Sequence, residues 1–200
     1  MMNMKTSVAR RLLLLVATVD PRTLLERRWP SAPGDPLPAP KPNEVNWALT
    51  TTGAQATASS QDPRYPASGT IDSVRDDTGW ASGAGQPLPQ WLQVDFGQMR
   101  TVTQFVVISY QHEASPETAT KWGLMKYQIQ AWDAAAADWK TVVTQSGGRA
   151  GKVRVHDLSR PLHTAKFRIN VTRVASLDGR ARLLQLEAWG PRTDDTHRHE

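Results

Sequence analysis

Cysteine is absent from this 200-residue sequence, which excludes a disulfide framework, a thiolate metal site and a cysteine nucleophile. Long hydrophobic runs are absent as well. The apolar stretch near the N-terminus, residues 12–19, is too short to cross a membrane, which takes about 20 residues. We therefore expect no membrane insertion. The length allows one domain with a sizeable core, because two full domains with linkers need more residues.

An excess of charge of one sign is missing from the part of the chain that is expected to fold. The net charge of +5 divides into +4 over residues 1–43, +2 over residues 44–190 and −1 over the last ten residues. Proteins that bind nucleic acid carry a basic patch or stripe on the folded domain. The nearly neutral middle segment therefore argues against nucleic acid as a partner.

Catalytic motifs are absent too. The sequence contains neither a Gly-x-Ser-x-Gly nucleophile elbow nor a His-Glu-x-x-His zinc helix. The glycine-rich segment 146–153 lacks the first glycine and the final Ser/Thr of a phosphate-binding loop. Asp76 and Asp77 are adjacent, so in an extended backbone they point in opposite directions and cannot flank one scissile bond. We therefore expect that the protein is not an enzyme and has no catalytic residues.

The composition changes along the chain and predicts four segments. Residues 1–29 contain a basic segment and a short apolar run, which fits either an export-signal-like leader or a mis-called leader. Residues 30–43 hold six prolines and are expected to form a semi-rigid linker. Residues 44–190 are expected to form the folded domain, and residues 191–200 a disordered polar tail.

Short segments with alternating apolar and polar residues fill the predicted domain. This alternation is typical of antiparallel strands that cover a core on one side only. Several such strands at short spacing, without a convincing amphipathic helix among them, indicate a sandwich or jelly roll. The Ala134–Ala137 run lies between two aspartates and fits a hairpin loop better than a helix. The strand-like segments are residues 91–96, 101–110, 127–132, 152–155, 166–171 and 184–189.

Tryptophan is enriched, whereas phenylalanine is scarce. Seven of the eight tryptophans lie between Trp47 and Trp189, against three phenylalanines in the whole chain. Tryptophan suits a β-sandwich core, and it also provides flat platforms on which sugar rings stack. Trp80, Trp91 and Trp132 lie in strand-like motifs, so we expect them in the core.

Six short motifs follow one another between Asn46 and Gly190. In order, they are residues 46–60 (Asn-Trp-Ala-Leu to Ala-Thr-Ala-Ser-Ser), 65–82, 89–97 (Pro-Gln-Trp-Leu-Gln-Val-Asp-Phe-Gly), 120–123, 127–132 and 186–190. In this order they resemble the discoidin-like (coagulation factor 5/8 C-type) domains. The eukaryotic members usually end in a cysteine pair, so this chain is more similar to the bacterial branch, which includes the family 32 carbohydrate-binding modules. The resemblance implies an all-β, antiparallel jelly-roll β-sandwich with a galactose-binding-domain-like fold.

The resemblance also implies a structural calcium ion (Ca²⁺) in the loop before Trp80. Calcium takes six to eight oxygen ligands. The matching ligands would be Asp72, Asp77 and Thr78, with Glu187 from the closing strand or Gln185 as its alternative. Ser73 replaces the usual glycine, and the loop is about one residue longer than in many relatives. The alternative is that Asp72 caps a turn and Thr78 bonds the backbone locally.

Sugar binding in such domains uses loops at one end of the sandwich, where aromatic faces stack on sugars and polar groups bind hydroxyls. The resemblance therefore implies a ligand-binding set of Trp122, Tyr110, His112, Arg149 and Arg180. Trp122 is the candidate stacking platform. Each of the others has an ordinary surface role as its alternative.

The predicted function is non-catalytic carbohydrate binding, as an accessory to a glycoside hydrolase. The alternative is a protein-adhesion or assembly domain on the same scaffold, because a fold does not fix a function. The expected partner is a carbohydrate or cell-surface glycan. We expect a monomer that is secreted or held at the cell surface.

Overall fold

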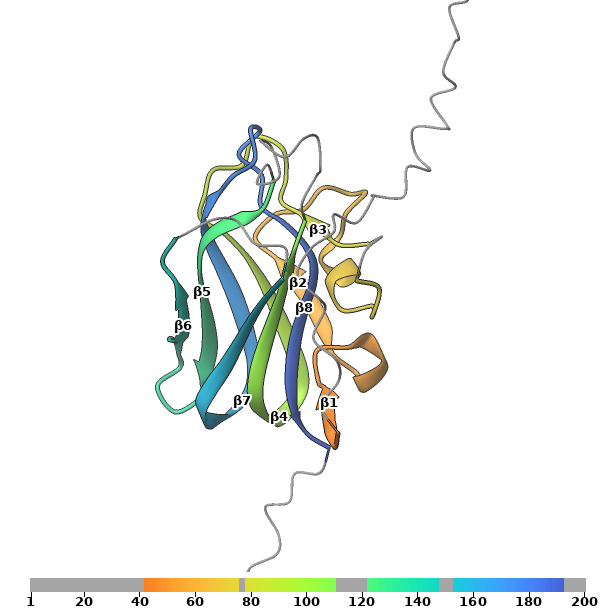
Figure 1. Cartoon of the computed structure of the whole chain (residues 1–200), viewed down its shortest axis with the longest axis vertical. Helices are drawn as coiled ribbons and strands as arrows, with labels where there is room; N and C mark the ends of the chain where they lie inside the picture. Colours follow the sequence, from red (N-terminus) through yellow and green to blue (C-terminus); the bar gives the residue numbers. More distant parts are fainter. Residues whose placement is uncertain (1–41, 76–77, 111–121, 148–152, 193–200) are drawn as a thin grey trace, which may run out of the picture.

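The computed structural model describes residues 42–75, 78–110, 122–147 and 153–192. Within these ranges the chain forms antiparallel strands and two short 3-10 helices, so the predicted all-β jelly-roll sandwich is confirmed (Figure 1). The elements are β1 Glu44–Asn46, η1 Thr50–Thr52, β2 Gln55–Ala58, η2 Ala67–Thr70, β3 Trp80–Ala81, β4 Gln90–Ser109, β5 Leu124–Asp133, β6 Asp138–Gln145, β7 Val153–Val174 and β8 Arg182–Pro191.

The two longest strands, β4 and β7, each pass through both layers of the sandwich. The first half of β4 pairs with β2 and with the second half of β7, which also pairs with β5. The second half of β4 pairs with β8 and with the first half of β7. A register shift between Asp95 and Arg100, next to Gly97 with a φ of 72°, marks the bend in β4. Four predicted strands therefore merge into two bent ones.

The core lies between the two layers and contains all three phenylalanines. Phe167 of β7 packs against Phe96 and Phe105, which come from opposite ends of the bend in β4, with ring centroids 5.5 and 4.8 Å apart. Each of these rings is almost completely buried. The contacts join the two halves of β4 through β7, so the phenylalanines hold the layers together.

Strand alternation decides which tryptophans reach this core. Trp80 is 1% exposed, as predicted. Trp91 and Trp132 are only half-buried, so their predicted core position is wrong. Leu92 and Ala131, their strand neighbours, point into the core, and adjacent residues of a strand point to opposite faces. Trp132 instead stacks edge-on against Trp139 of the β5–β6 hairpin.

The two ends of the sandwich differ. Figure 1 shows that the connections β2–β3 and β7–β8 lie at one end. The β5–β6 hairpin lies at the other end, where Asp133 accepts hydrogen bonds from the backbone of Ala135 and Ala136, which confirms the predicted hairpin loop. Glu44 and Pro191 are paired at this second end as well. The loops at the first end, which we call the loop end, are therefore far from the points where the domain begins and ends.

Candidate functional site

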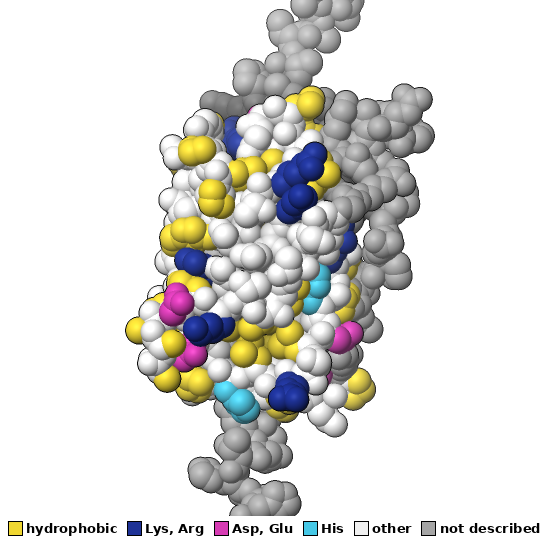
Figure 2. Space-filling model, turned by 90° about the vertical axis from the view of Figure 1, so that its left-hand side faces the viewer, with side chains coloured by type: hydrophobic (Ala, Val, Ile, Leu, Met, Phe, Trp, Pro, Cys, Tyr) yellow, Lys and Arg dark blue, Asp and Glu magenta, His cyan; other side chains and the backbone are white. Residues whose placement is uncertain are grey.

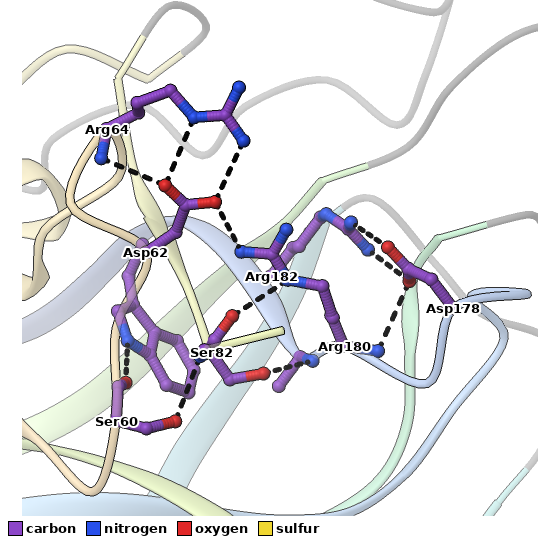
Figure 3. Close-up of polar contacts among 10 residues, drawn as sticks. Ser60, Asp62, Arg64, Ser82, Asp178, Arg180 and Arg182 are labelled. Atoms are coloured by element: carbon purple, nitrogen blue, oxygen red, sulfur yellow. Dashed lines mark hydrogen bonds and ion pairs between the residues drawn. The ribbon is translucent and has the colours of Figure 1, made fainter. Parts of the chain in front are cut away.

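Asp62 joins the two connections at the loop end. Its Oδ1 accepts hydrogen bonds from the backbone N–H and the Nε of Arg64, at 3.0 and 3.1 Å. Its Oδ2 accepts from Arg64 Nη2 at 3.0 Å and from Arg180 Nη2 at 2.8 Å (Figure 3). Arg180 is 118 residues away along the chain, so Asp62 links loops that no local sequence pattern connects.

Arg180, one of the predicted ligand-binding residues, is part of this network. Only 11% of its side chain is exposed. Its Nε donates to the backbone oxygen of Ser82 at 2.8 Å, and its Nη2 binds Asp62. Two of its donors are thus used within the protein, so the structure shows Arg180 as a link between the β2–β3 and β7–β8 connections.

Two serines, Ser60 and Ser82, make further hydrogen bonds between these loops. Trp80 Nε1 donates to the backbone oxygen of Ser60 at 2.9 Å, and Ser60 Oγ accepts from the N–H of Gly83 at 2.9 Å. Ser82 Oγ accepts from the N–H of Ala181 at 3.1 Å. Trp80 therefore fixes the backbone of the β2–β3 connection through its indole N–H, and Ser82 fixes that of the β7–β8 connection.

Two other predicted ligand-binding residues are related to Arg182: Trp122 contacts its guanidinium, and Tyr110 is affected by its charge. The Arg182 guanidinium lies 4.5 Å from the centre of the Trp122 ring. Burial raises the pKa of Tyr110, and the positive charge of Arg182 acts in the opposite direction. Asp178 holds this guanidinium through two hydrogen bonds of 2.9 and 2.5 Å (Figure 3). Trp122 adopts a φ of 90°, which is unusual for a non-glycine residue.

The structure thus brings together three of the five predicted ligand-binding residues. The other two, His112 and Arg149, lie outside the described residues. Sequence reasoning missed Asp62, Arg64, Asp178 and Arg182. The nearest signal was the Asp178-Gly179-Arg180 turn, from which only Arg180 was selected.

The two acids of this site are ionised and paired. The hydrogen bonds from Arg64 hold the pKa of Asp62 well below its ordinary value. The hydrogen bonds from Arg182 lower the pKa of Asp178 to about 2. A general acid for glycoside hydrolysis needs a raised pKa instead. The arrangement therefore suits recognition by aromatic faces and N–H donors.

These lowered pKa values predict that the protein loses stability in acid. Below about pH 4 the unfolded chain takes up protons at aspartates that stay ionised in the folded state, so the free energy of unfolding falls with falling pH. We expect the melting temperature (Tm) to fall between pH 4 and pH 2, and to fall less steeply in Asp178→Asn. Thermal denaturation followed by circular dichroism checks this. Equal slopes for both proteins would contradict the assignment to Asp178.

The described residues that were predicted to bind calcium make hydrogen bonds within the protein. Asp72 Oδ1 accepts from the N–H of Val74 at 2.9 Å and from Gln185 Nε2 at 2.7 Å. Thr78 Oγ1 donates to the backbone oxygen of Gly69 at 3.2 Å. These local bonds match the alternative interpretation of Asp72 and Thr78. Asp77 lies outside the described residues.

Glu187, the remaining predicted ligand, binds an arginine. Arg75 Nε and Nη2 donate to its two carboxylate oxygens at 2.6 and 2.8 Å. Across the described ranges, no three His, Cys, Asp or Glu side chains are grouped so that they could hold a metal ion. The described residues therefore do not fit a calcium ion in this loop.

Two hollows lie away from the loop end. A groove of about 660 Å³ runs between β6 and the first half of β7, with Val142, Val155 and Leu158 among its lining residues. A second hollow, of about 310 Å³, adjoins Trp132 and Met99. Figure 2, which views the molecule from the side that carries β6 in Figure 1, shows apolar side chains gathered on this face. Neither hollow contains the paired arginines and carboxylates of the loop end, so the loop end remains the candidate site.

The family model of the F5/8 type C domain matches residues 55–184. Among solved structures, the chain is similar to the family 32 carbohydrate-binding module of Clostridium perfringens NanJ in complex with galactose, at 21% identity and a TM-score of 0.60, with 74% of this chain and 99% of that chain covered. It is also similar to chitosan-binding module 1 from the chitosanase/glucanase of Paenibacillus sp. IK-5, at 27% identity and a TM-score of 0.58, covering 73% and 99%.

A larger protein contains a similar domain. The family 89 glycoside hydrolase of Clostridium perfringens matches at 18% identity and a TM-score of 0.57, over 74% of this chain and 15% of that chain. A search of curated proteins gave no significant match. Within the described residues, no helix is long and apolar enough to cross a membrane.

Proposed function

Because the chain belongs to the F5/8 type C domain family, we propose that it is a non-catalytic carbohydrate-binding module that recognises glycans through the loops at its loop end. The observation that carries this proposal is the contact of Arg182, whose guanidinium is fixed by Asp178, with the face of the Trp122 ring. Aromatic faces and fixed N–H donors are the groups that suit sugar rings and their hydroxyls.

Each group has a distinct part in this proposal. Arg182 covers one face of the Trp122 ring, so a sugar would stack on the opposite face. Arg64, with 67% of its side chain exposed, would donate to hydroxyls at the rim. Asp62 and Arg180 are positioning residues, since they join the loops from beneath. His112 and Arg149 stay predicted ligand-binding residues of the same rim.

The paired acids support the non-catalytic part of the proposal. Glycoside hydrolysis needs one carboxyl group that gives up a proton and a second that acts as base or nucleophile. At the loop end, arginines hold Asp62 and Asp178 in the ionised form. Neither of these two described acids is suited to protonate a leaving group near neutral pH.

The proposed biological role is that of an accessory module that tethers a partner enzyme to its substrate. The similar domain within a family 89 glycoside hydrolase supports this role, as does the proline-rich segment 30–43, which would act as a spacer. A single shallow site binds sugar weakly, so tethering or avidity would supply the useful affinity. A secreted or cell-surface location and a monomeric state belong to the same proposal.

Trp122→Ala tests the site. If the ring is the stacking platform, we expect glycan binding to weaken by about tenfold or more, since about 1.4 kcal/mol of lost contact corresponds to a factor of ten. The full-length protein is screened on a glycan array that includes galactose-type sugars and chitosan oligosaccharides. The best ligand is then titrated by calorimetry.

Trp139→Ala is the matched control, because Trp139 belongs to the β5–β6 hairpin at the opposite end of the sandwich. It is expected to keep wild-type affinity. Equal losses in both variants would reject the loop end as the site. If the folded wild-type protein binds no glycan on the array, the result would instead favour the protein-adhesion function.

A further inference from the structure

The carboxylate of Glu187 is buried on the outer face of β8. Only 3% of its side chain is exposed. Its pairing partner across the sheet is Val106 of β4, and the neighbouring buried residues Val106, Ile108 and Leu184 form a small apolar cluster. A buried charge in such surroundings is strongly destabilising unless it is paired and hydrogen-bonded. The fold therefore requires a cationic partner at this point.

Arg75 supplies that partner. Its Nε and Nη2 bind the two oxygens of Glu187 side by side, and 22% of its side chain is exposed. Trp189 Nε1 adds a third hydrogen bond to Oε2, at 2.7 Å. The carboxylate thus receives three N–H donors, and a second cation close to it would be repelled by the guanidinium.

Gln185 binds two further oxygens of the loop. Its amide nitrogen donates to Asp72 Oδ1 at 2.7 Å and to the backbone oxygen of Val74 at 2.9 Å, so one NH₂ group joins two oxygens of the type that calcium prefers. Gln185 Oε1 is buried without a hydrogen-bond partner among the described residues. Asp72 Oδ1 and the backbone oxygen of Val74 are thus bound by an amide donor instead of a cation.

We infer that Arg75 and Gln185 take the place of a calcium ion, so that the loop 72–75 is held on β8 by protein N–H donors and the fold does not depend on the metal. Ser73 adopts a φ of 72°, the conformation that the usual glycine would allow, so the loop keeps the expected turn without that residue. The inference concerns the folded state and stands apart from the proposed sugar site.

The first test uses the full-length protein with and without calcium. We expect the Tm to be the same, within about 1 °C, in 1 mM EGTA and in 5 mM CaCl₂, because a ligand raises the Tm only if it binds the folded state. A rise of several degrees with CaCl₂ would overturn the inference and support the structural calcium ion that the family resemblance implies. This comparison uses the wild-type protein only, so it tests the inference even if the variants fail to fold.

The second test removes the arginine. Arg75→Ala leaves Glu187 buried without its cation, and we expect the Tm to fall by about 10 °C. The matched control is Arg64→Ala, which also separates an arginine from a carboxylate but at a position with 67% of the side chain exposed, so its Tm should fall by no more than about 3 °C.

Adding Glu187→Gln to the Arg75→Ala variant removes the unpaired charge. We expect this double variant to regain at least half of the lost Tm, since the two residues act as one pair. Equal Tm losses for Arg75→Ala and Arg64→Ala, or no recovery in the double variant, would show that the pair does not carry the role assigned to it.

Discussion

Replacing Gly190 with alanine is expected to leave little folded protein. A Cβ at this position would lie 1.9 Å from the backbone oxygen of Thr101 and 3.1 Å from Trp47 Nε1. Thr101 belongs to β4 and is paired with His163 of β7, so its backbone cannot move away without breaking that pairing. Overpacking against flexible side chains costs about 1–3 kcal/mol, and a backbone clash costs more. That is a large share of a total stability of about 5–15 kcal/mol.

Gly85→Ala separates this clash from an ordinary glycine effect. Gly85 has a φ of 71° and no heavy atom within 4 Å of an added Cβ, so only backbone strain of about 1–2 kcal/mol is expected there. Soluble yield and thermal denaturation of both variants measure the difference. A Gly190→Ala protein that melts as high as Gly85→Ala would mean that β8 and β4 can move apart at this point.

The alternation of apolar and polar residues predicted most of the strands, but it did not predict that two pairs of consecutive segments form single bent strands. The segments 91–96 and 101–110 are both present, yet they form one strand, because Gly97 and a register shift bend β4 without ending it. Residues 153–155 and the segment 166–171 likewise belong to one strand, β7, whereas Lys152 lies outside the described residues. Turn residues mark places where the direction changes, and a sharp bend within a strand uses the same residues as a true turn.

The candidate site was predicted only in part, for a reason of distance along the chain. Trp122 and Tyr110 could be selected because each follows or precedes a strand-like segment and so belongs to a loop. The pairs that fix the loops, such as Asp62 with Arg180 and Arg75 with Glu187, join residues more than 100 positions apart. A charged residue in a loop shows no local sign of such a partner. The calcium ligands were selected by position in a motif, and a motif does not show which N–H donors the fold brings to them.

Each of these two long-range pairs fixes a different segment of the β2–β3 connection. Arg75 and Glu187 fix the loop 72–75 on β8, whereas Asp62 and Arg180 fix the segment 60–65 beside the β7–β8 connection. Arg182 lies two residues after Arg180, and its guanidinium contacts the Trp122 ring. A change at Asp62 is therefore expected to act on the fold and, through Arg180 and Arg182, on the aromatic surface.

Asp62→Ala is expected to lower the free energy of unfolding by about 2–3 kcal/mol, which for a domain of this size lowers the Tm by about 6–10 °C. The substitution leaves Arg180 without its carboxylate at a position where only 11% of the side chain is exposed. Solvent reaches the Arg64 side of Asp62, so the Arg64 bonds add little to this loss. Thermal and urea denaturation measure the effect, and calorimetry measures the accompanying loss of glycan affinity.

Arg64→Ala and the double variant Asp62→Ala/Arg180→Ala decide how this loss arises. Arg64→Ala removes two of the four hydrogen bonds to Asp62 and keeps both the backbone N–H bond and the buried pair with Arg180, so we expect it to cost less than about 1 kcal/mol. The double variant should lose less than the sum of its single variants, because Asp62→Ala leaves Arg180 without its carboxylate and this cost disappears once Arg180 is replaced as well. Additive losses, or an Arg64→Ala protein as unstable as Asp62→Ala, would show that the Asp62–Arg180 pair does not join the loops. The stability of the site would then depend on Trp80 and the serine backbone contacts beneath it.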